Sequence, residues 1–495
     1  MTGQFTALRD AFTALRDAFT AAGYTVDGVA ERLGPRAQAA LLRDETVPAT
    51  LATASGDALD GLVRLFLLQR QVPVEQAAEA MPLETALALG LVAVQGEQVR
   101  ALLDVRPYGE AGEQDVWWVV SDLGPRPDRG QRPAAPLADE HVVGIGGAST
   151  TLAQWTVRDS VGATLDLGTG CGVQALHASR HSDRVVATDI SGRAVRLAQL
   201  TAALSGVTFD LRQGDLLEPV RGESFDLIVS NPPFVVGAPP TVARTYRDAR
   251  LPLDVITERL VRELPARLTL GGTAQLLGSW LHRAGESWHD RVGGWLPDGV
   301  DALVVQREVL DPAEYVATWL RDAGEEGTPT YAERYELWLA GLDAARAEGI
   351  AFGLVALRRT DEPARVTLLD LPHPVEQPLG GHVAGWFTRQ RVLAATAVQD
   401  LVLVIAPDVV QEQHGRPGAD DPEQLLLRQQ VGLRRPASVG TATAALAGAC
   451  DGRLPVGALL AAVREVLDGD LAMSDQQVLD EVATLVEAGI LRPAG

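Results

Sequence analysis

The sequence contains no lysine, only two cysteines and few aromatic residues, and it has no long apolar run. Two cysteines, Cys171 and Cys450, cannot build a disulfide framework. Neither they nor the eight histidines stand at spacings typical of metal ligands. No segment is long and apolar enough for a membrane helix, and we expect no signal peptide, because no charged and then apolar stretch stands at the start. We therefore expect no metal site, no membrane partner and a cytoplasmic location.

Basic charge is also scarce, since 43 arginines stand against 65 acidic residues and the formal net charge is −22. Because every segment of the chain is acidic, we expect no broad basic face of the kind that drives non-specific nucleic-acid binding. A polynucleotide would have to be held locally, by a few clustered arginines. Arg244, Arg247 and Arg250 form the densest basic cluster near the mouth of the ligand site predicted below, and the same residues would serve equally well to solvate a loop.

At 495 residues the chain is too long for one ordinary core, so we expect several domains. Five alternating strand and helix patterns between residues 163 and 309 predict a parallel α/β sheet with helices on both faces. The predicted divisions are an N-terminal helical, winged-helix-like domain (1–121), a linker (122–140), the α/β core (141–360), a β-rich segment (361–410), a second linker (411–423) and a C-terminal helical, winged-helix-like domain (424–495).

The chain opens with a tandem duplication, in which Phe5–Ala11 has the sequence FTALRDA and Phe12–Ala18 repeats it. The apolar positions alternate at spacings of three and four, which predicts an amphipathic helix that packs on the following domain. Residues 59–108 show three helical patterns and then a hairpin around Gln95–Gly96, an arrangement that resembles a winged helix. The acidity of this segment favours a small docking domain over a domain that binds nucleic acid.

A glycine-rich turn follows the first strand of the predicted sheet. The strand Ala163–Gly168 leads into the turn at residues 168–172, and a helix begins at Val173. Glycine lets such a turn bend sharply and approach a ligand closely, and the N–H groups at the helix start face the ligand's polar end. Nicotinamide enzymes use nearly the same turn. The second strand ends at Asp189, whose carboxylate can accept hydrogen bonds from both hydroxyls of a ribose.

The fourth strand, Phe225–Ser230, ends in the sequence NPPF, at the edge where ligands bind in open α/β sheets. The Asn231 side-chain oxygen and the Pro232 carbonyl oxygen can accept the two N–H protons of an amide or exocyclic amine. Successive prolines fix the backbone, and Phe234 can stack on a flat substrate group. An Asn-Pro-Pro sequence can also simply end a strand, but at this place in the sheet we favour the chemical role.

Taken together, these motifs resemble, across residues 141–360, the class I S-adenosylmethionine-dependent N-methyltransferases that carry an NPPF motif. That group includes ribosomal RNA guanine-N2, N6-adenine and release-factor glutamine methyltransferases. The resemblance implies an α/β fold with a Rossmann-like, seven-stranded core, and S-adenosylmethionine as the cofactor. The implied cofactor-binding residues are Asp166, Gly168, Thr169, Gly170, Gly172, Asp189, Ile190, Asp215, Leu216 and Asn231. The implied catalytic residues are Asn231, Pro232, Pro233 and Phe234.

The resemblance also suggests what several of these residues contact. It implies Asp166 close to the methionine part of the cofactor, Asp215 near the adenine amino group and Leu216 beside the adenine ring. In such enzymes the segment before the first strand closes over the cofactor, and Gly144–Trp155 occupies that place here. Its residues Thr150 and Thr151 are therefore further candidate contacts of the cofactor. Residues 312–350 form an insertion with two helices, whose aromatic residues we expect in a core.

For the substrate, the NPPF motif specifies a planar nitrogen and nothing finer. The leading hypothesis is methylation of an exocyclic base amine in RNA, either ribosomal RNA or tRNA. A phenylalanine in the fourth place of the motif, Phe234, favours this hypothesis. The alternative is methylation of a glutamine or another amide in a protein, which an acidic surface permits more easily. A second alternative is a regulator that senses the cofactor and binds nucleic acid, although such a sensor has no use for an intact NPPF. The sequence leaves the oligomeric state open.

Overall fold

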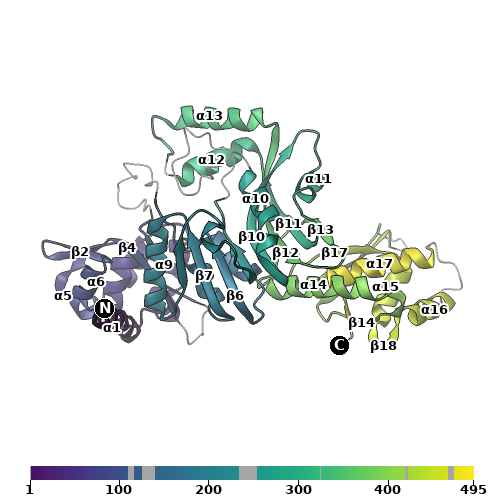
Figure 1. Cartoon of the computed structure of the whole chain (residues 1–495), viewed down its shortest axis with the longest axis horizontal. Helices are drawn as coiled ribbons and strands as arrows, with labels where there is room; N and C mark the ends of the chain where they lie inside the picture. The colour runs from purple at the N-terminus through teal and green to yellow at the C-terminus, as the bar shows by residue number, and fades with distance from the viewer. Residues whose placement is uncertain are drawn as a thin grey trace. The chain divides into compact units, whose positions relative to one another are not determined.

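The computed structural model places most of the chain, and its elements are labelled in Figure 1. The residues that it describes are 2–109, 116–124, 140–233, 254–323, 325–417, 422–466 and 473–494. They fall into two compact units, which are described one at a time. The first unit comprises Met1–Ala153, Ser160–Trp295 and Val309–Phe352, and the second comprises Gln154–Asp159, Leu296–Glu308 and Gly353–Gly495.

The core of the first unit is a parallel sheet whose strand order reverses at its first strand. In space the order is β10-β9-β6-β7-β8, and each neighbouring pair is parallel. The chain therefore runs outward from β6 to β8 and then returns to the other side of β6, which creates a topological switch point between β6 and β9. These strands are β6 (Val161–Leu167), β7 (Ser182–Asp189), β8 (Asp210–Gln213), β9 (Phe225–Ser230) and β10 (Leu268–Arg283).

The full strand order of this sheet is β13-β11-β12-β10-β9-β6-β7-β8, which confirms the predicted Rossmann-like core. The remaining strands are β11 (Val300–Leu310), β12 (Ala347–Arg359) and β13 (Val366–Asp370), and β13 is an eighth strand beyond the seven predicted. From the sequence, the third strand is predicted at Val207–Leu211, which is wrong by three residues at its start. The Val207 N–H bonds back to the Ala202 carbonyl at 3.0 Å and closes the preceding helix, so pairing begins only at Asp210.

Helix α9 (Gly192–Ser205) packs on β7 and β8, and the local sequence explains both of its ends. The Ser191 hydroxyl caps the N-terminus by accepting a hydrogen bond from the Ala194 N–H. Gly206 ends the helix in the left-handed conformation, with a φ of 72°. The buried residues recur at helical spacing along one side. They are Ala194, Leu197, Ala198, Leu200, Thr201, Ala202 and Leu204.

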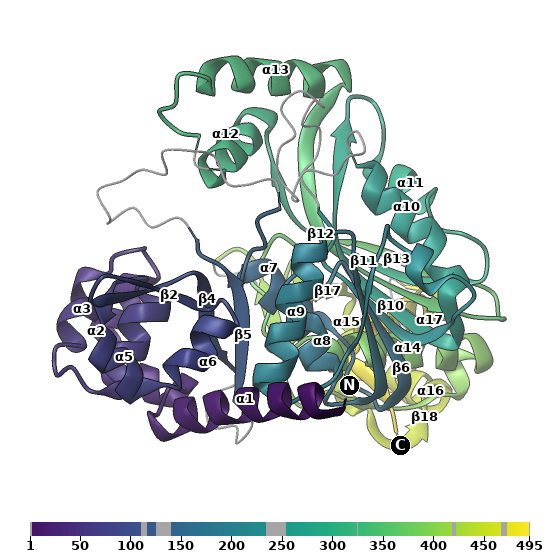
Figure 2. The same cartoon turned by 60° about the vertical axis from the view of Figure 1, so that its left-hand side comes forward.

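Helix α1 (Thr2–Ala21), dark purple in Figure 2, packs on α9, as the repeated apolar pattern predicts. Phe12, Leu15 and Phe19 are buried in the hydrophobic core that also contains the inward residues of α9. Leu8 is 46% exposed.

The segment between α1 and Leu103 contains helices followed by a hairpin. Three helical segments, α4 (Ala58–Leu62), α5 (Val74–Ala80) and α6 (Leu83–Ala88), precede the hairpin of β2 (Val92–Gln95) and β3 (Gln98–Ala101). A short strand, β1 (Val72–Pro73), pairs with β3 and completes the small sheet.

The sequence prediction is wrong about residues 103–108, which do not continue the hairpin. They form β4 (Leu103–Tyr108), which pairs with β5 (Trp117–Asp122). The Leu91 carbonyl, just before β2, accepts from both the Leu102 and the Leu103 N–H, which ends the hairpin there.

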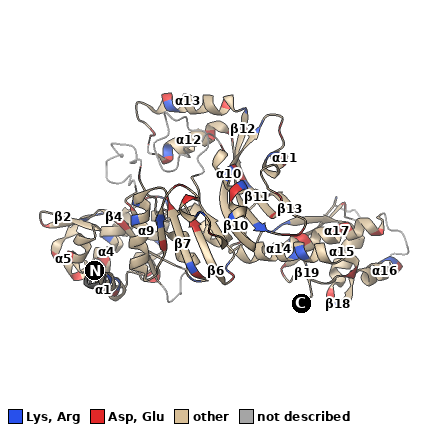
Figure 3. Cartoon of the chain, viewed as in Figure 1, with Lys and Arg blue, Asp and Glu red and all other residues tan. Residues whose placement is uncertain are grey.

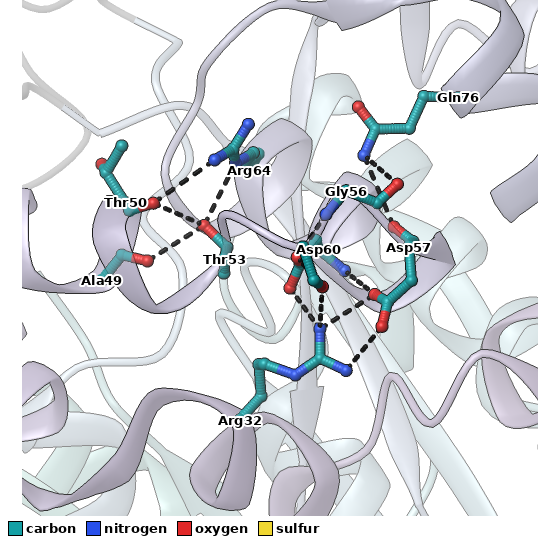
Figure 4. Close-up of polar contacts among 10 residues, drawn as sticks. Arg32, Ala49, Thr50, Thr53, Gly56, Asp57, Asp60, Arg64 and Gln76 are labelled. Carbon is teal, nitrogen blue, oxygen red and sulfur yellow. Dashed lines mark hydrogen bonds and ion pairs between the residues drawn. The ribbon is translucent and has the colours of Figure 1, made fainter.

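A buried polar network fixes the loop that leads into α4 (Figure 4). Asp60 is fully buried and accepts hydrogen bonds from the Gly56 N–H at 2.8 Å and from the hydroxyl of Ser55, while Arg32 pairs with it from α2 (Val26–Leu41). Arg32 also donates to both carboxylate oxygens of Asp57. These bonds lower the pKa of Asp57 to about 2. The pairing keeps a buried carboxylate satisfied and holds the loop in place.

The insertion contains the two predicted helices, α12 (Pro312–Asp322) and α13 (Tyr331–Ala344). Tyr315 and Trp338 are buried and meet edge to face, with ring centroids 6.0 Å apart. They belong to one hydrophobic cluster, with Leu320 and Leu342 beside them. The aromatic residues of these helices therefore build a core, as expected.

The second unit contains helix α14 (Gly380–Ala395), an antiparallel sheet and a C-terminal helical group. The sheet has the order β15-β16-β17, and residues 411–414, which the sequence assigns to a linker, lie in β15 (Val409–His414). β16 is Gln424–Gln429 and β17 is Pro436–Val439. In the described ranges, no helix is both long and apolar enough to cross a membrane, and no group of His, Cys, Asp and Glu side chains is placed to hold a metal ion.

The C-terminal group resembles a small winged helix in its order of elements. Helices α15 (Thr441–Ala449), α16 (Val456–Val466) and α17 (Asp475–Ala488) share one hydrophobic core. A small sheet accompanies them, in the order β18-β14-β19. Its strands are β14 (Val402–Ile405), β18 (Asp451–Pro455) and β19 (Leu491–Pro493).

Candidate active site

The strand register places three of the predicted site residues at one edge of the sheet. Leu167 of β6 is the partner of Thr188 in β7 and of Ser230 in β9. The next residue along each chain is therefore Gly168, Asp189 or Asn231, and all three lie side by side at the carboxyl ends of parallel strands. Open α/β sheets bind their ligands at this edge, next to the switch point.

The glycine turn adopts backbone angles that favour glycine. The φ angles of Gly168, Gly170 and Gly172 are 75°, 55° and 89°, all in the left-handed region. A Cβ on Gly168 or Gly170 would meet no described atom within 4 Å, so these two residues face open space. A Cβ on Gly172 would instead contact Ala198 at 3.4 Å, on α9. The first two glycines therefore border the candidate site, and the third faces the protein.

Asp166, two residues before the turn, is buried with one carboxylate oxygen unused. Its Oδ2 accepts from the Thr169 hydroxyl at 2.6 Å and from the Ala175 N–H at 3.0 Å. Its Oδ1 is buried and has no hydrogen-bond partner among the described residues. Burial raises the pKa of Asp166 to about 7, against the lowering effect of the two hydrogen bonds. An unpartnered buried acceptor of this kind suits a ligand that donates a hydrogen bond.

Asp189 both shapes the glycine turn and faces the same edge. Its Oδ2 accepts from the Gly170 N–H at 2.9 Å, and its Oδ1 accepts from the Ser191 N–H at 2.9 Å. Burial raises its pKa, while those backbone N–H groups act in the opposite direction. Because each carboxylate oxygen can accept more than one hydrogen bond, both remain able to take a ribose hydroxyl. Ile190, the next residue, is 50% exposed and provides an apolar surface beside it.

The loop after β8 carries the two remaining predicted cofactor contacts. The Gly214 N–H donates to the Asp189 carbonyl at 2.9 Å, which ties this loop to the end of β7. Asp215 is exposed, and Leu216 has a φ of 42°, in the left-handed region that a residue with a Cβ seldom adopts. Backbone strain of this kind concentrates at ligand sites. The loop is thus held at the edge where Asp189 lies.

Asn231 follows β9 directly, and it is the only asparagine in the chain. Its Oδ1 is buried and has no hydrogen-bond partner among the described residues. Pro232 and Pro233 follow it at the end of the described range. Phe234 and the arginine cluster Arg244, Arg247 and Arg250 lie outside the described residues.

The segment before the first strand forms helix α7 (Gly147–Trp155), and a residue that the sequence prediction missed holds it. Gln174, in the first turn of α8 (Val173–Ala178), donates to the Ser149 carbonyl at 2.8 Å. Thr150 does not stand free before the helix, because its hydroxyl donates to the Gly147 carbonyl at 3.0 Å inside α7. Gln174 is only 6% exposed, and no sequence pattern indicates this contact.

Two stretches of the chain match known family models. Residues 144–276 match the Methyltransferase small domain, and residues 21–102 match a domain of unknown function, DUF7059. The first match covers the glycine turn, Asp189 and the NPPF motif. With the strand order, it confirms the predicted class, a Rossmann-like methyltransferase core.

Individual relatives carry two kinds of name. The chain is 36% identical over 157 residues to a release factor glutamine methyltransferase of Xylella fastidiosa, covering 31% of this chain and 52% of the relative. It is 32% identical over 118 residues to ribosomal RNA small subunit methyltransferase C of Alcanivorax borkumensis, covering 24% and 32%. The chain thus spans about half the length, or less, of these curated relatives.

Among solved structures, the chain is similar to the T. thermophilus 16S rRNA N2 G1207 methyltransferase in complex with AdoMet and guanosine. The sequence identity is 20%, the alignment covers 47% of this chain and 60% of that one, and the TM-score is 0.28.

Proposed function

We propose that this protein is an S-adenosylmethionine-dependent N-methyltransferase that acts on a planar nitrogen. One observation carries the proposal. Asn231, the only asparagine in the chain, leaves the sheet beside the glycine turn, and its buried Oδ1 has no hydrogen-bond partner among the described residues. A residue kept only to end a strand would have no need of a buried amide oxygen without a donor among those residues.

The residues at the edge fit the proposed cofactor. The open space over Gly168 and Gly170 lets a ligand approach the backbone, and the two oxygens of Asp189 suit the ribose hydroxyls. The unused Oδ1 of Asp166 suits the ammonium group of the methionine part. Ile190, Asp215 and Leu216 are the proposed contacts of the adenine ring. When bound, S-adenosylmethionine supplies an electrophilic methyl group on a sulfonium.

The proposed role of Asn231 is to hold the acceptor nitrogen. Its Oδ1 and the Pro232 carbonyl accept the two N–H protons of the substrate, which fixes the nitrogen and leaves its remaining electron pair directed at the methyl group. Methyl transfer makes the nitrogen cationic, so one proton then leaves to solvent without a strong base. Pro232 and Pro233 hold the backbone, since proline restricts φ and adds no competing N–H. Phe234 is the proposed stacking partner of the flat group.

For the substrate we propose an exocyclic base amine in RNA, as the name of the Alcanivorax relative suggests. Arginines and acidic residues are interspersed over the elements drawn in Figure 3, so local arginines would have to grip the polynucleotide. A glutamine of a protein is the second candidate, favoured by the net charge of −22 and by the Xylella relative. Both substrates place the enzyme in the cytoplasm, and the predicted N- and C-terminal domains would select the target.

One experiment separates these candidates. The protein is incubated with methyl-labelled S-adenosylmethionine and a ribosome-containing lysate, and the products are digested with ribonuclease or protease. The proposal predicts label that ribonuclease releases. Label that protease releases and ribonuclease does not would contradict the RNA substrate and support the protein substrate. Cofactor binding without label in any fraction would contradict methyl transfer and favour a cofactor-sensing regulator.

A further inference from the structure

Asp122 and Arg193 form an ion pair between the last residue of β5 and the first turn of α9, in which the carboxylate is buried and the Arg193 side chain is 40% exposed. The Arg193 Nε donates to Oδ2 at 2.8 Å and to Oδ1 at 3.1 Å, and its Nη2 also donates to Oδ1. The Asp122 side chain is 9% exposed. Burial acts to raise the pKa of this carboxyl, but the bonds from Arg193 and from the Val142 N–H outweigh it, and the pKa lies below its usual range.

The same carboxylate holds the chain that leads to α7. Its Oδ2 accepts from the Val142 N–H at 2.8 Å, and the Asp122 N–H donates to the Val142 carbonyl at 3.1 Å. Two residues further on, Gly144 lies so close to β5 that a Cβ there would stand 2.5 Å from the Ser121 Oγ. The segment is therefore fastened at Val142 by Asp122 and at Ser149 by Gln174. Between these points it passes from β5 to the helix beside the glycine turn.

Arg193 stands where an unpaired arginine would be unfavourable, because the N-terminal turn of a helix carries partial positive charge. It lies four residues after Asp189, in the turn whose cap, Ser191, donates its N–H to the Asp189 carboxylate. Fixing Arg193 therefore fixes the start of α9, and with it the backbone that carries Asp189 and Ile190. Asp122 supplies the negative charge that makes this arrangement favourable.

The rest of β5 matches α9 in spacing. The Val120 N–H donates to the Thr201 hydroxyl at 2.9 Å, and the Trp118 N–H donates to the Ser205 hydroxyl at 3.1 Å. Two residues along a strand span about 6.6 Å and four residues along a helix span about 6 Å, so the step from Trp118 to Val120 on β5 matches the step from Ser205 to Thr201 on α9. Arg193 lies eight residues before Thr201, so the ion pair with Asp122 is a separate contact, one helical turn beyond that match, between β5 and the helix that follows Asp189.

We propose that Asp122 is a positioning residue for the cofactor site: through Arg193 it sets the turn that carries Asp189 and Ile190, and through Val142 it sets the segment that leads to α7. This inference rests on the proposed function, because its ligand is the proposed cofactor. Asp122 itself touches neither cofactor nor substrate in this account. Its loss should change the affinity for the cofactor and leave the chemical step alone.

The test compares Asp122→Asn with Asp60→Asn. Asp60 is the matched control, since it too is a buried carboxylate that pairs with an arginine and accepts a backbone N–H, but it lies in the loop before α4. Calorimetric titration with S-adenosylhomocysteine should give a Kd about tenfold weaker for Asp122→Asn, the loss expected for a charge-assisted hydrogen bond, and an unchanged Kd for Asp60→Asn. At saturating cofactor, kcat should be unchanged in both. Arg193→Lys should keep a higher affinity for S-adenosylhomocysteine than Arg193→Gln, because lysine keeps the positive charge that pairs with Asp122.

A second readout does not depend on the cofactor. In the free protein, the amides of residues 189–194 and 142–149 should exchange hydrogen faster in Asp122→Asn than in the wild type, and Asp60→Asn should leave them unchanged. Equal exchange in all three proteins, or equal Kd losses in the two variants, would overturn the positioning role. Failure of the wild type to bind S-adenosylhomocysteine would instead contradict the proposed function, and the exchange result would still decide the role of Asp122.

Discussion

Leu167 and Ser230 are partners in the parallel pair of β6 and β9, and the Ser230 hydroxyl donates a hydrogen bond to the Leu167 carbonyl at 2.8 Å. This bond locks the register at the last residue of each strand. The residues that follow, Gly168 and Asn231, belong to two motifs that lie more than sixty residues apart in the chain. Because the register holds them level, the proposed cofactor turn and the proposed nitrogen-binding residue share one edge.

The three glycines of the turn should differ in what they affect. Alanine at any of them should destabilise the fold by about 1 kcal/mol, because all three have left-handed φ angles. At Gly168 and Gly170 the added methyl group would enter the open space and should weaken S-adenosylhomocysteine binding at least tenfold. At Gly172 it would face Ala198, and the affinity should hold. Denaturant unfolding and calorimetric titration test this, and equal affinity losses at all three would contradict it.

Asp166 should make stability depend on pH. Its folded pKa of about 7 lies above the value of an unfolded aspartate, so the folded chain binds an extra proton between the two. The contribution to stability is fully present below about pH 4 and is lost as the pH rises to about 7. Urea unfolding at a series of pH values should show this slope in the unliganded wild type, and Asp166→Asn should flatten it. An unchanged slope in the variant would mean that groups other than Asp166 cause the pH dependence of stability.

Cofactor affinity should show the opposite trend with pH. If the ionised Asp166 pairs with the ammonium group of the cofactor, the Kd should weaken by about tenfold for each pH unit below 7. Asp189 is the nearby charged group that raises the same pKa, so the titration of Asp189→Asn is a necessary control. A Kd that does not change between about pH 5 and pH 8 would mean that Asp166 has no part in binding.

Asp189→Ala should weaken binding of S-adenosylhomocysteine by about 10- to 100-fold, the loss expected when charge-assisted hydrogen bonds are removed. The substitution removes the acceptor of the Gly170 and Ser191 N–H groups and the proposed ribose contact together. Asp189→Asn keeps one acceptor oxygen and should lose less. Equal affinity of both variants and the wild type, measured by calorimetric titration, would exclude Asp189 from the site.

Local patterns were sufficient to predict the sheet and most of the edge. The apolar strands, the glycine turn and Asn231-Pro232-Pro233 are contiguous in sequence, and parallel strands necessarily bring their carboxyl ends together. Other features depend on residues that are distant in the chain. The pairing of Asp122 with Arg193 joins positions 71 residues apart, and no periodicity in the sequence predicts it. The pairing of β4 with β5 and the bond from Gln174 to Ser149 are similar cases.

The proposed role of Asn231 is tested by a paired measurement on Asn231→Ala. Single-turnover methyl transfer should fall by about 100-fold or more, as when a group that stabilises a transition state is removed. The Kd for S-adenosylhomocysteine, measured on the same preparation, should stay within about twofold of the wild type. That result would separate the holding of the nitrogen from the binding of the cofactor. Transfer at the wild-type rate, or an equal loss of transfer and cofactor affinity, would contradict the proposal that Asn231 holds the acceptor nitrogen.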